Sequence, residues 1–176
     1  NLGIALGKLG SSLFELKQYG EAEPLLRRYL WLQDPELPCG DVVFAFGDEC
    51  IPSLCLVHTL NLTGKHDEAA ELVRSFVEHL IKLEAGEDGK PMPERIRQVE
   101  LLLVIHGRVL LNLKKSKEAQ AAYSLALERR LTDVGAFHES YDDLVQAVVE
   151  VCPKKDPFAA KVVADMVAAK EAVSSA

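Results

Sequence analysis

One set of intervals recurs along this chain and constrains its fold more than any other feature. The first set, at intervals of three, nine, four and three residues, is Gly10, Leu13, Ala22, Leu26 and Tyr29. The intervals return in Val57, Leu60, Ala69, Val73 and Phe76, and again in Gly107, Leu110, Ala119, Tyr123 and Ala126. An acidic residue precedes each central Ala, at Glu21, Glu68 and Glu118. Spacing that returns in this way indicates a protein built from repeated units.

Apolar residues recur at helical spacing on both sides of each central Ala, which predicts a pair of helices for every unit. We expect four helical hairpins, at about 2–33, 41–85, 93–131 and 135–173. Within the last one, Asp156 is the expected N-cap residue and Pro157 the first helical position. The whole chain, 1–176, is predicted to be one all-α domain.

The fourth copy of the pattern is weak. It consists of Val148, Val151, Ala160, Ala164 and Val167. A terminal repeat is expected to depart from the pattern because its outer face meets water. Two irregular inserts separate the hairpins, and the segment DVVFAF in the first could form a short strand or an extra helical turn. We favour a helix, because no other segment offers a strand to pair with it.

Three glycines, Gly3, Gly7 and Gly10, lie inside the first predicted helix. Each costs a helix about 1 kcal/mol relative to Ala, so we expect close approach of a neighbouring helix at this position. The alternative, a phosphate-binding loop, is rejected because GIALGKLGSS lacks the required spacing and follows no strand.

Composition narrows the function classes. The net charge is −7 without a broad basic face, which argues against a nucleic-acid partner. No apolar run reaches the length of about 18 residues that a membrane span needs, so no membrane insertion is expected. Four cysteines do not form a disulfide framework in a chain of 176 residues. We therefore expect an intracellular protein, cytoplasmic or organellar, in a reducing compartment. Because the first residue is Asn1 and not Met, we expect a processed chain or a fragment of a longer one.

Catalytic and metal-binding patterns are weak in this sequence. Cys50, Cys55 and His58 lie close together, and Cys39 could add a fourth ligand, but a zinc site usually has tighter Cys pairing. Buried thiols are the favoured interpretation. No nucleophile-elbow pattern occurs, and no carboxylate pair is placed in a shared pocket. We therefore predict a protein that is not an enzyme and needs no cofactor and no metal.

The segment LGSSLFELKQYGEAEPLLRRYL, together with its copies near residues 59–80 and 106–127, resembles the tetratricopeptide repeat. QYGEAEPLLRR is most similar to the long repeats of the kinesin-light-chain group. The Trp that is usual early in the first helix is absent from every copy. The resemblance implies a right-handed α-α superhelix of about four stacked hairpins, the last one degenerate, and a role as a binding scaffold for proteins.

In this family the first helices of successive hairpins line a concave groove. Carried over position by position, the resemblance places Gly7 there and predicts eight groove residues that would contact a partner: Ser11, Phe14, Leu54, His58, Asn61, Val104, Arg108 and Leu111. Such a groove suits an apolar helix or an extended peptide with one acidic contact at Arg108. The alternative is that Val104 and Leu111 are covered by neighbouring helices or by the inserts.

Three functions remain open at this point. The first is a non-catalytic scaffold or adapter that captures a peptide or helix of a protein partner. The second is a stable subunit of a larger multiprotein complex. The third is a regulatory or substrate-positioning helical-repeat fragment of a larger enzyme.

Overall fold

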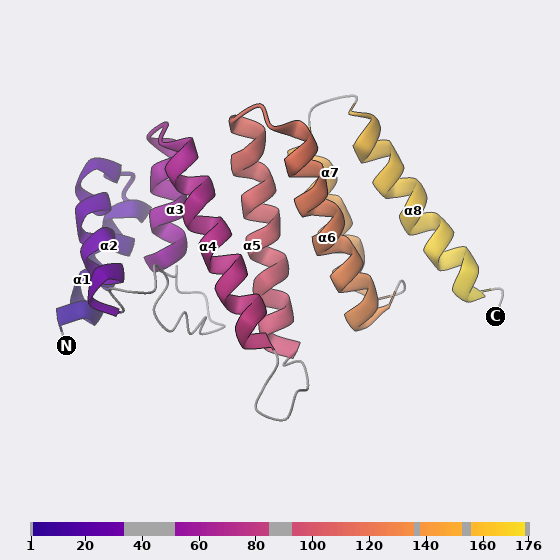
Figure 1. Ribbon diagram of the computed structural model, residues 1–176, viewed down its shortest axis with the longest axis horizontal. Coiled ribbons are helices and arrows are strands. Elements are labelled where there is room, and N and C mark those ends of the chain that lie inside the picture. The colour runs from indigo at the N-terminus through magenta and orange to yellow at the C-terminus, as the bar shows by residue number, and fades with distance from the viewer. Residues whose placement is uncertain (1, 34–51, 85–92, 136–137, 153–155, 175–176) are drawn as a thin grey trace. The chain divides into compact units, whose positions relative to one another are not determined.

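The computed structural model describes residues 2–33, 52–84, 93–135, 138–152 and 156–174, and within these ranges the chain is all-helical, without strands (Figure 1). The eight helices are α1 (Leu2–Glu15), α2 (Tyr19–Gln33), α3 (Pro52–Leu62), α4 (His66–Glu84), α5 (Pro93–Asn112), α6 (Ser116–Val134), α7 (Glu139–Val151) and α8 (Pro157–Ser174). The all-α prediction is confirmed for these residues. The segment DVVFAF lies outside the described residues.

The chain divides into two compact units, Asn1–His79 and Leu80–Ala176, with the division inside α4. The prediction of a single domain stays a prediction.

In the first unit, glycine lets α1 and α2 pack closely. A Cβ atom added at Gly10 would lie 2.7 Å from Cδ2 of Leu26, and one added at Gly7 would lie 2.9 Å from Cδ2 of Tyr29. Real Cβ atoms do not approach other atoms so closely, so α2 could not lie this near α1 if these positions carried side chains. The predicted close approach is therefore confirmed at both glycines.

The turns that join the helices of a hairpin repeat as faithfully as the helices do. Lys17, Gly64 and Lys114 occupy the same position in their hairpins, and all three have positive φ, at 60°, 81° and 60°. The residue after each donates its backbone N–H to a carbonyl five residues earlier, over 2.8 to 2.9 Å. One turn geometry is thus used three times, as expected for repeated units.

Burial follows the predicted spacing in the second and third copies. All five residues of the second set are fully buried: Val57, Leu60, Ala69, Val73 and Phe76. In the third copy Tyr123 is fully buried against Gly107, where an added Cβ would overlap its ring. The large residue of one helix fills the space above the small residue of the other, and this joins α5 to α6.

A buried ion pair also joins α5 to α6. Glu100 is fully buried, and its Oε2 accepts a hydrogen bond of 2.6 Å from Nε of Arg130. Burial raises the pKa of Glu100 above its ordinary value of 4.5, and the Arg130 guanidinium offsets only part of that effect.

The last hairpin, α7 and α8, has the expected start and the expected departure from the pattern. Asp156 Oδ1 accepts the backbone N–H of Phe158 at 2.9 Å, which confirms the predicted N-cap. Ala160, Ala164 and Val167 are exposed, unlike the corresponding residues of the second hairpin. No helix within the described ranges has both the length and the apolar character needed to cross a membrane.

Candidate functional site

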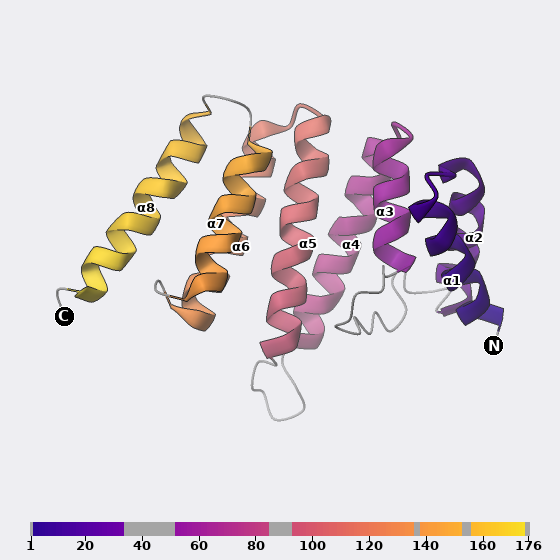
Figure 2. The ribbon, with the colours of Figure 1, turned by 180° about the vertical axis from the view of Figure 1, so that it is seen from behind.

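Five of the predicted groove residues lie in the first unit, on α1 and α3. Helices α1 and α3 contact each other and lie nearer the viewer than α2 and α4 in Figure 2. The rings of Phe14 and His58 face each other with centroids 6.1 Å apart and planes inclined by 31°. Both rings are half-buried, as is Leu54 one turn earlier on α3. The structure thus brings three of the predicted residues into one partly open, mostly apolar face.

A third ring extends this face. Tyr19, the first residue of α2, lies with its ring centroid 5.7 Å from that of Phe14, at an angle of 51°. Phe14 therefore stands between Tyr19 and His58. Tilted ring contacts of this kind add about 0.5–1.5 kcal/mol beyond the burial of area, so the rings hold one another in place. We call Phe14, Tyr19, Leu54 and His58 the ring face.

Ser11 and Asn61 border the ring face in different ways. Ser11 is buried, and its hydroxyl accepts a hydrogen bond of 3.6 Å from the thiol of Cys55. It therefore lies beneath the surface and joins α1 to α3. Asn61 is half-buried, with Oδ1 2.8 Å from Nδ1 of His66 across the α3–α4 turn. The amide oxygen acts as acceptor when that ring nitrogen carries the proton.

The other three predicted residues lie on α5, in the second unit. Val104 and Leu111 are half-buried, and Arg108 is exposed. Arg108 makes no ion pair with any residue that the structure describes. Its guanidinium is therefore available to an acidic group of a partner.

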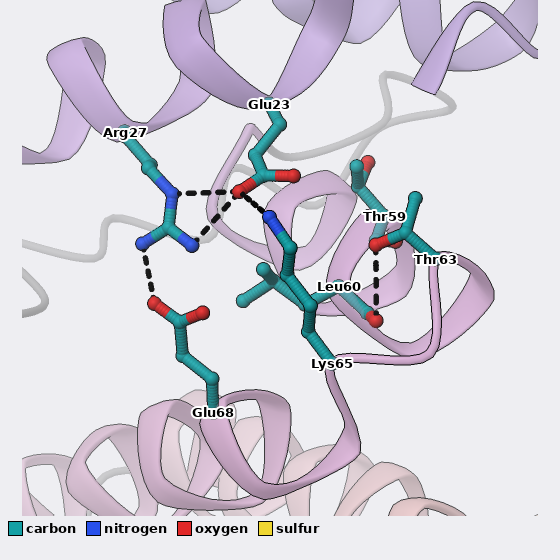
Figure 3. A network of polar contacts seen from close by, with 7 residues as sticks. All are labelled: Glu23, Arg27, Thr59, Leu60, Thr63, Lys65 and Glu68. Carbon is teal, nitrogen blue, oxygen red and sulfur yellow. Dashed lines mark hydrogen bonds and ion pairs between the residues drawn. The ribbon is translucent and has the colours of Figure 1, made fainter. Parts of the chain in front are cut away.

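A cluster of charged side chains, which the sequence analysis did not predict, joins α2 to the second hairpin (Figure 3). Arg27 Nη2 and Lys65 Nζ both contact Oε1 of Glu23, at 2.9 and 2.6 Å. Arg27 Nη1 also contacts Oε1 of Glu68, at 2.6 Å. Arg27 of α2 thus contacts Glu68 of α4, and Glu23 of α2 contacts Lys65, the residue directly before α4.

The charges in this cluster shift the pKa values of its carboxylates. Burial acts to raise the pKa of Glu23, but hydrogen bonds from Lys65 and Arg27 outweigh it and lower the pKa. The hydrogen bond from Arg27 likewise lowers the pKa of Glu68. The Arg27 and Glu68 side chains are 40% and 48% exposed, so water screens their attraction and each pair contributes about 0–1 kcal/mol. The cluster sets alignment more than stability.

Beneath the cluster lies a cavity of about 210 Å³ in the first unit. It is lined by residues of three helices: Arg27, Leu30, Leu56, Leu60, Glu68 and Leu72. We call these contacts between α2 and the α3–α4 hairpin the joint. Its apolar floor comes from leucines of all three helices, and its rim is the Arg27–Glu68 ion pair.

The same joint position is polar again in the second unit. Glu23 follows the central Ala22 by one residue, and Lys65 precedes the central Ala69 by four. At the corresponding places after Ala119 and before Ala160, Gln120 Nε2 donates to Oδ1 of Asp156 over 3.4 Å. The chemistry differs, an ion pair in one case and an amide–carboxylate contact in the other, but the positions are the same. Counting from the central Ala marks these positions as equivalent in the sequence, and the structure shows the contacts between them.

The described residues contain no group of three or more His, Cys, Asp or Glu side chains that could hold a metal ion. Cys55 is a free thiol buried against Ser11, while His58 turns to Phe14, so these two candidates point to different neighbours. Cys39 and Cys50 lie outside the described residues. Burial raises the pKa of the Cys152 thiol, which keeps it protonated and weakly reactive.

Comparison of the chain with models of protein families, with curated proteins and with solved structures finds no match. What these surfaces do must therefore follow from their own residues.

Proposed function

We propose that this protein is a non-catalytic binding scaffold of the tetratricopeptide type, whose stacked hairpins form a right-handed superhelix. The observation that carries the proposal is the ring face on α1 and α3. Its aromatic and apolar side chains are half-buried and held rigidly by one another. Rigid aromatic side chains with one open face are the residues that most often anchor a protein partner.

The repeated geometry supports the same proposal. Three hairpins share one turn conformation, and two joints share one pair of polar positions. Units that repeat so closely stack on one another and present corresponding residues of successive first helices on one side. The ring face would bind an apolar helix or extended peptide of a protein partner, and Arg108 on α5 would bind an acidic residue of a partner.

A second candidate, a stable subunit of a larger complex, is favoured by one observation. Leu2 and Leu9 of α1, and Leu16 directly after this helix, are all more than half exposed. A row of exposed leucines is a surface that another protein would cover.

Partner capture tests the proposal. The immobilised chain should retain a protein from an extract of its own source, and Phe14→Ala or Arg108→Glu should each reduce the retained amount at least fivefold. Leu125→Ala changes an exposed leucine of α6 and serves as the matched control. All three variants should melt within a few degrees of the original chain. If Phe14→Ala retains as much partner as Leu125→Ala does, the ring face is not the binding site, and the same result for Arg108→Glu would exclude the charged contact.

A further inference from the structure

Exposed leucines form a row along α1 and the turn that follows it. Leu2, Leu9 and Leu16 follow one another at intervals of seven residues and are 63%, 53% and 69% exposed. Seven residues are close to two helical turns, so Leu2 and Leu9 project from one side of α1, and Leu16 directly follows the last residue of this helix, Glu15. Phe14 projects from a different side of α1, towards His58, so the row of leucines is not part of the ring face.

The second hairpin shows what covers this side of a first helix. Leu9 stands one residue before Gly10, and Leu56 stands one residue before Val57, so the two leucines are equivalent. Leu56 is 2% exposed and lines the joint together with Leu30 of α2. The leucine that is buried in the second hairpin is therefore open in the first.

The correspondence covers every residue that the second hairpin contributes to the joint. The accepting side of the joint consists of Leu56, Leu60, Lys65, Glu68 and Leu72. The equivalent residues of the first hairpin are Leu9, Leu13, Gln18, Glu21 and Leu25. The three leucines and the glutamate recur, and only the lysine is replaced. We call these five residues the receiving face.

We propose that the receiving face binds an amphipathic helix with the chemistry of α2, in the way that α3 and α4 bind α2. The helix carries a basic side chain opposite Glu21 and a large apolar side chain three residues later, as α2 does with Arg27 and Leu30. Glu21 is exposed and pairs with no residue that the structure describes, so its charge is available. Gln18 replaces Lys65, so the partner helix needs no acidic residue corresponding to Glu23.

Charge selects a partner of this kind over a second copy of the chain. In a head-to-tail dimer the last helix, α8, would supply the occupant. At the places of Arg27 and Leu30, counted from the central Ala160, α8 has Asp165 and Ala168. Asp165 would meet Glu21 with the same charge, and Ala168 would leave the floor of the site unfilled.

A synthetic peptide tests the proposal on the whole chain. The probe has the sequence of residues 19–33 with Glu23→Gln, a fluorescent label, and a lactam bridge on the face away from Arg27 and Leu30. The bridge is needed because isolated helices of this length are marginal in water. We expect saturable binding in fluorescence anisotropy, and a loss of tenfold or more with Leu9→Glu in the protein.

Charge reversal provides the decisive comparison. Glu21→Arg should weaken binding of the probe by about two- to fivefold, in keeping with a partly exposed ion pair, and a probe with Arg27→Glu should restore it. Glu15→Arg, on α1 like Leu9, and Leu101→Glu, at an exposed leucine of α5, are the matched controls and should leave binding unchanged.

The proposal is overturned if the probe does not saturate, or if the controls lose as much binding as Leu9→Glu. It is also overturned if the chain alone doubles its mass and Leu9→Glu abolishes this, because the occupant would then be a second copy. Phe14→Ala should not affect the probe, so failure here and failure of the proposed ring face are distinguishable.

Discussion

At the scale of single residues, the pairing of a small side chain with a large one sets the distance between helices. Gly107 lies under the ring of Tyr123, and Gly10 lies under Leu26. In each pair the second residue follows the first by sixteen positions. Glycine is poor for helix stability, so its presence here reflects the contact and not the helix.

Two glycine substitutions should therefore have opposite effects. Gly107→Ala places a Cβ inside the ring of Tyr123 and should destabilise the fold by about 1–3 kcal/mol, although Ala favours helix formation. Gly20→Ala, at a helical position with nothing within 4 Å, should stabilise by about 0.5 kcal/mol. Urea unfolding of both variants measures the difference. Equal shifts in the same direction would contradict the close contact at Gly107.

The sequence predicted this feature only in part. The cost of glycine to a helix identified Gly10 as a close-packing position, and Gly107 occupies the equivalent place in the third copy of the pattern. It did not predict that Ser11 is buried against Cys55, or that Glu100 is buried against Arg130. Each of these contacts joins two helices, and a residue's own sequence neighbours do not reveal which side chain it meets in another helix.

At the scale of elements, the helices were predicted well and the joint between hairpins was not. Within the described residues the limits of the hairpins differ from the expected ones by a few residues, since apolar periodicity and signals such as Asp156 mark them directly, and the expected start of the second hairpin at residue 41 lies outside these residues. The Glu23–Arg27–Lys65–Glu68 cluster consists of charged residues on helix surfaces, which usually remain solvated. Only the folded chain shows that these four meet.

The turn conformation that the three hairpins share leads to a prediction about the stability of one turn. Lys114 has positive φ, a conformation that costs a side chain about 1 kcal/mol and costs glycine almost nothing. Lys114→Gly should therefore stabilise the protein by about 0.5–1 kcal/mol, as Gly64 already does for its own hairpin. Lys115→Gly is the control, because Lys115 has φ of −90°, and it should be neutral or destabilising. Thermal melts of the two variants at equal concentration make the comparison, and a Lys114→Gly variant that melts no higher than the original would contradict it.

At the scale of the whole molecule, two compact units share one continuous helix, α4. The sequence predicted repeated hairpins but not the division into two units. A recurring spacing carries no information on where contacts between neighbouring hairpins are few. In a repeat protein the stability of one unit depends on its neighbours. The shared helix makes coupled unfolding the expected behaviour.

Ala119→Arg tests that coupling. Ala119 is fully buried in the second unit, so a long charged side chain should destabilise the fold by a few kcal/mol. The only Trp of the chain, Trp31, belongs to the first unit. We expect the variant to shift the Trp31 fluorescence transition and the far-ultraviolet circular dichroism transition together, towards lower denaturant. A Trp31 transition that stays in place would show two units that unfold independently, and an unchanged dichroism transition would contradict the predicted repeat register.

The small-with-large pairs also constrain how this sequence can change. The two positions hold Gly and Leu in the first hairpin, Val and Val in the second, and Gly and Tyr in the third. From the first hairpin to the second, a gain of volume at the first position accompanies a loss at the other, and the bulkiest second residue, Tyr123, stands opposite a glycine, so neither member can change alone without a void or an overlap. Among descendants of this sequence, residues sixteen apart should be exchanged as correlated couples, and a helix transplanted from one hairpin to another should fit only together with its original companion.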